Sequence, residues 1–359
     1  MSPLLVYVQS AGLPAQHEPM AVIGDHISGG NDTVDSVPAM KVAVVVYDGV
    51  FDSGLAAVLD VLSNANALGG QLHVSSPTWD VTLVGPAPKA RTGAGLLVTT
   101  EPLEPADTAD LLVVPALGES DPSALLDHVG GEVSRPVREL VARTRARGAT
   151  IASACAGTFL LAEAGVLDGL RATTSWWLSP AFRDRYPEVE LDHSRMVISC
   201  EGVITAGAAF GHVDLALAIV RAASPALADL VARHLVVDER PSQAAYAIPS
   251  ALAQSDPTVA AFELWIREHL AEPIGIPEAA RAIGVSERTL QRAVRRTVGT
   301  SPIRFVQDLR IERASHLLRT TGLSLETISR KVGYEHPDTL RVLLRERTGK
   351  TTSALRQSK

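Results

Sequence analysis

The stretch that decides the C-terminal fold is Ile276-Pro-Glu-Ala-Ala-Arg-Ala-Ile-Gly-Val-Ser-Glu-Arg-Thr-Leu-Gln-Arg292. Small residues fill its first half, Gly284 lies where a turn is expected, and Ser286 stands where a helix N-cap is expected. In the second half Leu290, Val294 and Val298 recur at i, i+4 and i+8, which predicts a buried helix face. The pattern predicts a helix-turn-helix unit whose second helix enters the major groove of DNA.

The opposite face of that second helix carries basic and amide side chains. Arg and Gln can each donate two hydrogen bonds to the edge of guanine or adenine. We expect this face to contact DNA through Arg288, Thr289, Gln291, Arg292, Arg295 and Arg296. The plainer alternative is a solvated charged face, and some of these arginines would contact phosphate without reading sequence.

A second unit of the same kind follows. Leu325–Val332 is typical of a helix, Gly333-Tyr334 of a turn, and Pro337 of the first residue of the next helix. Its predicted reading face consists of His336, Asp338, Thr339, Arg341 and Arg345. Between the units, Pro302–Leu318 predicts one connecting helix, which would space two readers for adjacent major grooves about 34 Å apart.

The net charge of the chain changes sign near the start of the predicted DNA-binding region. The 359 residues carry a net charge of -7, but from Thr258 onward 18 basic and 11 acidic residues give +7, which leaves -14 for the rest. Hydrophobic residues make up 46% and charged residues 20%, which is typical of a folded globular protein. An acidic body with a basic end indicates a sensor joined to a nucleic-acid reader.

The body reads as strands alternating with helices. A β-branched run, Lys41–Tyr47, precedes a helical pattern through Leu55, Val58 and Leu62. Further apolar strands are expected at 80–84, 111–115, 150–153 and 203–206, separated by helices at 136–146 and 213–221. We therefore predict an α/β fold with a doubly wound, mostly parallel, flavodoxin-like sheet, followed by an all-α domain with two helix-turn-helix units. The expected boundaries are a flexible tail at 1–39, the α/β domain at 40–222, a linker at 223–257 and the DNA-binding domain at 258–359.

Cysteine usage and hydropathy bear on the compartment. The two cysteines, Cys155 and Cys200, cannot build a disulfide framework, and no uncharged apolar stretch is long enough to span a bilayer. Residues 1–37 lack the basic and apolar regions of a signal peptide, and Met40 is an alternative start of translation. We expect a cytoplasmic protein without a membrane partner, and the sequence indicates no metal site and no cofactor.

Cys155 lies between a predicted strand and a predicted helix, within Gly148–Gly165. The small residues Ala154, Ala156 and Gly157 permit the sharp turn of a nucleophile elbow, where a helix N-terminus would lower the pKa of the thiol. The alternative is a buried, inert cysteine that packs as a small hydrophobe.

Over its last hundred or so residues the chain resembles the AraC/XylS family of bacterial transcription regulators. The residues that carry the resemblance are Ser286–Arg292, Gly299–Pro302, Leu309–Ala314, Leu317-Leu318 and Ile328–Tyr334. The chain departs from the family where Leu340 and Leu343-Leu344 replace phenylalanines, and where Thr352 and Leu355 replace a proline and an aromatic residue. The resemblance implies sequence-specific binding to double-stranded DNA.

From about Lys41 to Tyr246 the chain resembles the PfpI/ThiJ branch of the class I glutamine amidotransferase-like fold, and within it the GlxA-type regulators. The carriers are Val58–Leu62, Ala65-Asn66, Val114–Gly118, the elbow at Cys155, Leu161–Gly169, Ala172–Trp176, Tyr186-Pro187, Thr205–Gly207 and Asp214–Leu217. The resemblance implies that Cys155 lies at the base of a pocket, with backbone amides from the elbow and from the Pro115–Gly118 turn facing a bound anion or carbonyl. It also implies a homodimer.

A cysteine hydrolase needs a base beside its thiol, and here that base is missing. Relatives commonly place histidine where this chain has Ser175, and Gly54 stands at a position that is acidic in many relatives, with Asp52 two residues away. His193 and His212 remain as possible bases, but a structural or surface role is expected for both. We therefore predict a transcription regulator that is not an enzyme. Its small-molecule effector is expected at Cys155, Ala156, Ser175, Trp176, Ala116 and Gly118.

Two alternatives stay open at the level of sequence. One is a cysteine-dependent amidase or protease-like hydrolase fused to a DNA-binding module. The other is a regulator whose body only dimerises and binds no small molecule.

Overall fold

The computed structural model describes residues 39–72, 76–238, 240–243 and 246–357. The tail predicted at 1–39 lies, apart from Ala39, outside the described residues.

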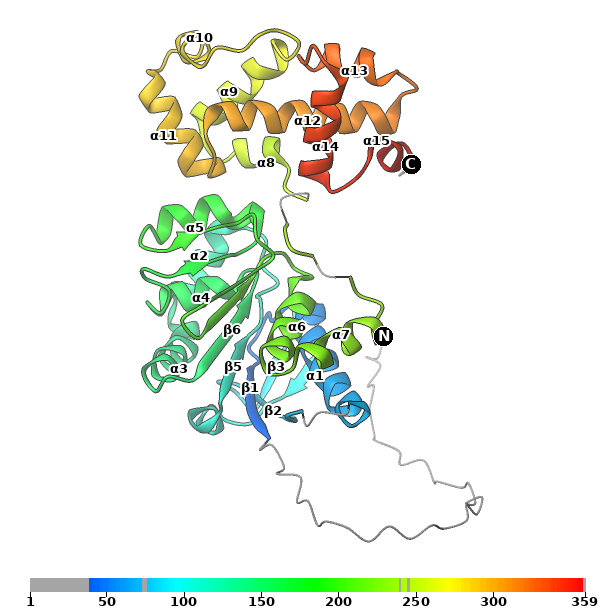
Figure 1. The fold of residues 1–359 in the computed structure, drawn as a ribbon. Coiled ribbons are helices and arrows are strands. Elements are labelled where there is room, and N and C mark those ends of the chain that lie inside the picture. The colour runs from blue at the N-terminus through cyan, green and yellow to red at the C-terminus, as the bar shows by residue number, and fades with distance from the viewer. Residues whose placement is uncertain (1–38, 73–75, 239, 244–245, 358–359) are drawn as a thin grey trace, which may run out of the picture. The chain divides into compact units, whose positions relative to one another are not determined.

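A six-stranded sheet forms the centre of the α/β domain (Figure 1). Its strand order is β2-β1-β5-β6-β10-β9, and every neighbouring pair is parallel except β9 with β10. The strands are β1 Met40–Val45, β2 Trp79–Val84, β5 Leu111–Val114, β6 Thr150–Ala154, β9 Val197–Cys200 and β10 Val203–Ala206. Strands β5 and β10 are buried along their whole length, because apolar runs of this kind lie between two layers of helices. This confirms the predicted doubly wound, mostly parallel fold.

Helices cover both faces of the sheet (Figure 1). Helices α1, α6 and α7 pack on one another on one face, and α2, α3 and α4 pack together on the other. The helices of this domain are α1 Asp52–Leu68, α2 Pro122–Gly130, α3 Arg135–Ala146, α4 Gly157–Glu163, α5 Ser179–Arg185, α6 Gly211–Ala223 and α7 Pro225–His234. Short 3₁₀ helices span Gly69–Gln71, Glu104–Thr108, Glu132–Ser134 and Trp176–Leu178. Two small ribbons complete the domain: β3 Lys89–Arg91 with β4 Leu97–Thr99, and β7 Arg171–Ala172 with β8 Glu190–Leu191.

The stretch predicted as a linker, residues 223–257, contains two helices. Helix α7 buries Leu227, Ala228 and Val231 in the core of the α/β domain, and it follows α6 after the single residue Ser224. The Ala- and Pro-rich composition that indicated a linker is explained by Pro225 at the start of α7 and by small residues packed against α1 and α6. The second helix is α8, Pro249–Ala253.

The C-terminal region is entirely helical among its described residues. Its elements after α8 are α9 Pro257–Glu268, α10 Ile276–Ala282, α11 Glu287–Val298, α12 Pro302–Thr320, α13 Leu325–Lys331, α14 Pro337–Thr348 and α15 Thr352–Gln357. Helix α12 contributes Phe305 and Leu309 to one apolar cluster with α9–α11, and Ile311 and Leu318 to a second cluster with α13–α15. One rigid helix therefore links two separate small cores, as the predicted connecting helix required. Within the described residues, no helix has both the length and the apolar character needed to cross a bilayer.

Candidate functional site

The first helix-turn-helix unit consists of α10 and α11. Gly284 provides the turn with a φ of +74°, which glycine adopts without the strain of a side chain. The Ser286 side chain caps α11 by accepting the N–H of Thr289 at 3.1 Å. Leu290 and Val294 are fully buried, so the helix can present only its other face to a partner.

That other face of α11 is exposed and basic. Arg288, Arg292 and Arg295 are exposed, and none of them forms an ion pair with another described residue. Gln291 is also exposed, and its amide donates to Glu287 Oε1 at 2.9 Å. The three guanidinium groups therefore keep their hydrogen-bond donors available.

Two predicted members of the same face have partners inside the domain. Arg296 Nη2 lies 2.7 Å from Asp256 Oδ2, in an ion pair that joins α11 to the start of α9. Asp256 also caps α9, since its Oδ1 accepts the N–H groups of Thr258 at 2.8 Å and Val259 at 3.2 Å. The hydroxyl of half-buried Thr289 lies 2.8 Å from the hydroxyl of the N-cap serine.

The second unit repeats this arrangement with α13 and α14. Gly333 forms the turn with a φ of +77°, and Pro337 is the first residue of α14. Leu340 and Leu344, at positions where the sequence departs from the phenylalanines of the resembling family, are fully buried in the second core. The predicted reading residues His336, Asp338, Thr339, Arg341 and Arg345 are all exposed.

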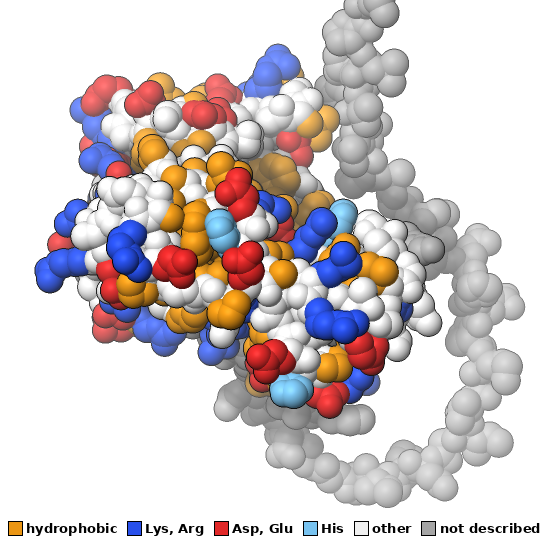
Figure 2. Space-filling model, turned by 90° about the horizontal axis from the view of Figure 1, so that it is seen from above, with side chains coloured by type: hydrophobic (Ala, Val, Ile, Leu, Met, Phe, Trp, Pro, Cys, Tyr) orange, Lys and Arg blue, Asp and Glu red, His pale blue; other side chains and the backbone are white. Residues whose placement is uncertain are grey.

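The second reading face carries less available positive charge than the first. Arg341 pairs with Asp338 one turn earlier, whereas Arg345 has no ion pair among the described residues. Figure 2, which looks onto the C-terminal helices from above, shows Lys and Arg side chains in separate groups with Asp and Glu between them. In this view the basic side chains therefore do not form one continuous surface.

The elbow at Cys155 has the sharp geometry that its small neighbours predict. Cys155 joins β6 to α4 with a φ of +54°, a conformation that few residues other than glycine adopt. Gly157 makes the turn possible, because a Cβ there would lie 2.6 Å from the Pro115 carbonyl oxygen. Cys155 is therefore a strained, non-glycine residue at the carboxyl end of β6.

The Cys155 thiol is buried and faces a hydroxyl group. Only 5% of the residue is exposed, and Ser175 Oγ donates a hydrogen bond to Sγ at 2.8 Å. Burial raises the pKa of the Cys155 thiol, although hydrogen bonds from Ser175 and from the Ala156 N–H act in the opposite direction. The thiol is therefore kept protonated rather than activated as a thiolate.

The Pro115–Gly118 turn uses its amides internally. The Ala116 N–H donates to His212 Nε2 at 3.1 Å, and the Gly118 N–H donates to the Gly49 carbonyl at 2.7 Å. Both groups already have acceptors from the protein, so a bound anion would have to compete with them.

His212 is a buried structural residue. It is fully buried, and burial lowers its pKa to about 4, so the ring is neutral. With Nε2 accepting from Ala116, Nδ1 donates to the Ala209 carbonyl at 2.6 Å. Its ring also fills the space beside Gly54, where a Cβ would lie 2.7 Å from Cε1. An acidic side chain at position 54 would therefore collide with this histidine.

His193 and Asp52 are likewise engaged elsewhere. His193 Nδ1 lies 2.5 Å from Arg183 Nη2, and burial followed by the positive charge of Arg183 lowers the pKa of His193 to about 4. Asp52 accepts a hydrogen bond from the Thr92 hydroxyl and another from the Ala94 N–H at 2.8 Å. Among the described residues, the side chain that hydrogen-bonds the Cys155 thiol is that of Ser175, and no group of three His, Cys, Asp or Glu residues could hold a metal ion.

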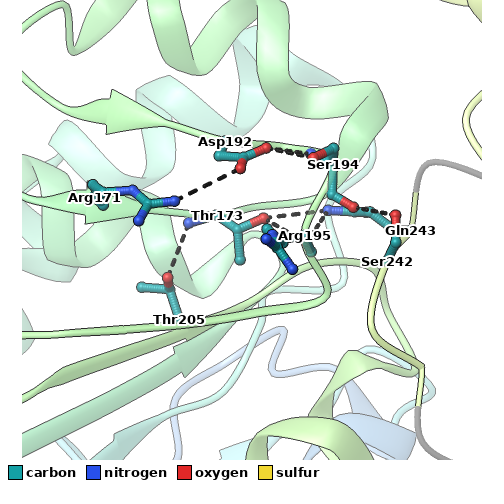
Figure 3. Close-up of polar contacts among 8 residues, drawn as sticks. All are labelled: Arg171, Thr173, Asp192, Ser194, Arg195, Thr205, Ser242 and Gln243. Atoms are coloured by element: carbon teal, nitrogen blue, oxygen red, sulfur yellow. Dashed lines mark hydrogen bonds and ion pairs between the residues drawn. The ribbon is translucent and has the colours of Figure 1, made fainter.

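Sequence reasoning missed one residue of this region, Gln243. It lies in the stretch predicted as linker, yet it is fully buried and its side chain contacts the segment Thr173–Trp176. Figure 3 shows its contact with Thr173. The Trp176 N–H donates to Gln243 Oε1 at 3.2 Å, and Trp176 itself is half-buried against Trp177. A lone glutamine in a polar run gives no signal in the sequence, because its partners lie about 70 residues away.

Comparison with known proteins agrees with this architecture. Residues 40–222 match the model of the DJ-1/PfpI family, and residues 279–358 match a helix-turn-helix domain model. The chain belongs to the DJ-1/PfpI family and joins this domain to a C-terminal helix-turn-helix domain of the AraC type.

Three bacterial transcription regulators are similar to half or more of this chain. The chain is 28% identical over 288 residues to the HTH-type transcriptional regulator CdhR of Pseudomonas aeruginosa, which covers 79% of this chain and 82% of CdhR. It is 31% identical to the HTH-type transcriptional regulator ArgR of the same organism (52% of this chain, 58% of ArgR). It is 26% identical to the HTH-type transcriptional regulator GlxA of Rhizobium meliloti (53% of this chain, 60% of GlxA). The chain thus spans most of CdhR but less than two thirds of ArgR and GlxA.

Proposed function

We propose that this chain is a sequence-specific DNA-binding transcription regulator whose DJ-1/PfpI domain acts as a sensor and not as an enzyme. The observation that carries the proposal is the exposed face of α11, where Arg288, Arg292 and Arg295 have no ion-pair partner among the described residues. Arg side chains with free donors on a recognition helix are suited to guanine edges and to phosphates. The full candidate DNA surface comprises Arg288, Thr289, Gln291, Arg292, Arg295, Arg296, His336, Asp338, Thr339, Arg341 and Arg345. Of these, we expect the three unpaired arginines of α11 to contribute most.

The sensor proposal rests on the buried elbow. Its candidate ligand residues are Cys155, Ala156, Ser175, Trp176, Ala116 and Gly118. A small effector bound here would act on the same segment, Thr173–Trp176, that contacts Gln243 of the connecting stretch. Ligand binding would then shift the population of states that present the readers to DNA. We further propose a homodimer, which would double the DNA contacts, and a location in the cytoplasm, where the chromosome of a bacterial cell lies.

The rival function, a cysteine-dependent hydrolase, has less support. The Cys155 thiol is paired with the Ser175 hydroxyl, which cannot accept the thiol proton near neutral pH. Both ring nitrogens of His212 and the Nδ1 of His193 are engaged with groups other than the thiol. Burial also raises the thiol pKa, which opposes nucleophilic activation.

The test is binding of the full chain to DNA fragments around its own genomic locus across a salt series. We expect one fragment to be retained over competitor DNA, with affinity that falls linearly on a log-log salt plot. Arg292→Ala should weaken specific binding by about 5- to 150-fold, the loss typical of one base-contacting arginine. Arg233→Ala, which removes the same charge from an exposed position on α7, is the matched control and should bind like the wild type. Equal, weak binding by all three proteins to every fragment would refute the proposed function.

A further inference from the structure

Hydrogen bonds and an ion pair fasten the stretch that leads to the DNA-binding helices to the sensor domain. Arg240 pairs with Asp214 and donates to the Phe210 carbonyl at 2.8 Å, and the three residues after it add further hydrogen bonds. The Gln243 backbone N–H donates to the Ser194 carbonyl at 2.9 Å, and Ser242 Oγ donates to the same carbonyl at 2.7 Å (Figure 3). The Met196 N–H donates to the Pro241 carbonyl at 3.4 Å. Residues 241–243 therefore run beside residues 194–196, and this brings the Gln243 side chain to the edge of the sensor core.

The side-chain amide of Gln243 meets a complete set of complementary groups. Its Oε1 accepts the Trp176 N–H at 3.2 Å. Its Nε2 donates to the Thr174 carbonyl at 2.7 Å and lies 3.2 Å from the Arg195 carbonyl and 3.3 Å from Thr173 Oγ1. The single donor faces the amide oxygen and all acceptors face the amide nitrogen, so the orientation of the group is defined by its partners.

This set of partners is selective for a primary carboxamide. A carboxylate of the same shape would bring an oxygen against the carbonyl oxygens of Thr174 and Arg195 without a hydrogen to share. A hydrocarbon would leave the Trp176 N–H without its acceptor at a partly buried position, and an unsatisfied donor of this kind costs free energy.

The floor of the site is shaped for the planar amide. A Cβ added at Gly207 would clash with Gln243 Nε2 and would lie 2.5 Å from Cδ and 2.8 Å from Oε1. Gly207 does not have a positive φ, so its backbone does not itself demand glycine. The absent side chain at position 207 therefore serves to admit the amide.

The amide site and the Cys155 elbow share one segment of backbone. Thr174 Oγ1 donates to the Cys155 carbonyl at 2.7 Å, and Ser175 Oγ donates to Sγ at 2.8 Å. Gln243 holds the residues on either side of Ser175, namely the Thr174 carbonyl and the Trp176 N–H. A change at either site must move this segment or break one of its hydrogen bonds.

We propose that Thr173–Trp176, Arg195 and Gly207 form a binding site for a primary carboxamide, and that Gln243 is its internal ligand, which clamps the connecting stretch to the sensor. An internal ligand has an effective concentration of roughly millimolar or more, so a free amide binds measurably only where the glutamine has been removed. The consequence for DNA binding, a looser connection when the clamp is open, rests on the proposed function.

The test uses hydrogen–deuterium exchange of the full chain, followed at the Trp176 amide, without DNA. Gln243→Ala should make this amide exchange about tenfold faster, because its acceptor is lost. Acetamide matches the four heavy atoms that the substitution deletes, and it should restore the slow rate with a Kd on the order of 10 mM. Acetate should not restore it. Gln254→Ala, at an exposed glutamine just after α8, is the matched control and should exchange like the wild type.

A second variant approaches the site from the sensor side. Gly207→Ala should also speed exchange at Trp176 by expelling Gln243, but acetamide should not slow it, because the new methyl group occupies the site. Unchanged exchange in Gln243→Ala, or equal protection by acetate and acetamide, would overturn the proposal. If exchange behaves as expected and the wild type binds no DNA fragment selectively, the amide site stands and the regulator function fails.

Discussion

Arg296 was predicted as a DNA contact, and its ion pair with Asp256 gives that prediction a sharp test. The Arg296 side chain is 58% exposed, so the attraction itself contributes only about 0.5–1 kcal/mol. Its loss in Arg296→Ala leaves the Asp256 carboxylate, which is 8% exposed, without a cation, and this raises the cost to about 1–2 kcal/mol. We therefore expect Arg296→Ala to lower the free energy of unfolding and to change DNA affinity by less than about threefold. Arg292→Ala should instead leave the free energy of unfolding nearly unchanged and weaken DNA binding.

The assay is urea unfolding of the full chain, with DNA affinity measured on the same preparations. The cost of Arg296→Ala should fall to near zero in an Asp256→Ala background, because the pair is then already broken. It should also fall at low pH: hydrogen bonds and Arg296 lower the pKa of Asp256, so the stability from the pair is present above about pH 4 and disappears as pH drops through the lowered pKa. Full stability with a tenfold or greater loss of DNA affinity would show that Arg296 contacts DNA and that its pairing with Asp256 is incidental.

Three further predictions follow from buried groups of the sensor domain. Because burial raises the pKa of the Cys155 thiol, iodoacetamide at pH 8 should label it at least about tenfold more slowly than half-buried Cys200, as judged by mass spectrometry; faster labelling of Cys155 would contradict the inert thiol. Burial lowers the pKa of His212 from 6.5 to about 4, so its contribution to stability is complete above pH 6.5 and is lost as pH falls toward 4. The loss is up to about 3 kcal/mol, and a His212→Gln variant with the same pH profile as the wild type would exclude it. A Gly157→Ala Cβ would lie 2.6 and 2.7 Å from two backbone carbonyl oxygens, so this variant should lose more than about 3 kcal/mol of stability in urea, whereas Gly70→Ala, with nothing within 4 Å, should not.

Local patterns were enough to predict most of the fold. The run Lys41–Tyr47 predicted β1, and the cap and turn residues of α11 and α14 predicted both reader helices, because these signals lie within a few residues of one another. Strand β9 was not predicted, since only Ile198 among its residues is buried and its antiparallel pairing occurs at the edge of the sheet. Short edge strands give no long apolar run, and nothing local distinguishes them from a loop.

Local sequence patterns predicted much less of the candidate sites than of the fold. Sequence reasoning could propose Cys155 and Ser175 as neighbours through the resemblance, and the structure places their side chains 2.8 Å apart. It could not predict that His212 would accept the Ala116 N–H, 96 positions away in the sequence. Nor could it predict that the Gln243 side chain would donate to the Thr174 carbonyl, 69 positions away. Such contacts depend on tertiary packing, and neither a lone histidine nor a lone glutamine has a local pattern that indicates it.

These two contacts together change how the DJ-1/PfpI domain of this chain is understood. The His212 ring fills the space beside Gly54 and accepts the Ala116 N–H, while the Ser175 hydroxyl donates to the Cys155 thiol. The groups that would face the substrate in a hydrolase are therefore hydrogen-bonded within the protein. Gln243 does the same at the adjacent backbone segment, with a side chain that comes from the stretch leading to the DNA-binding helices. Internal residues therefore fill the polar positions around the Cys155 elbow, where the proposed effector would have to displace one of them. Gln243 is the internal group that lies on the stretch leading to the helix-turn-helix units. Under the proposed function, its displacement is therefore the change most directly able to alter DNA binding.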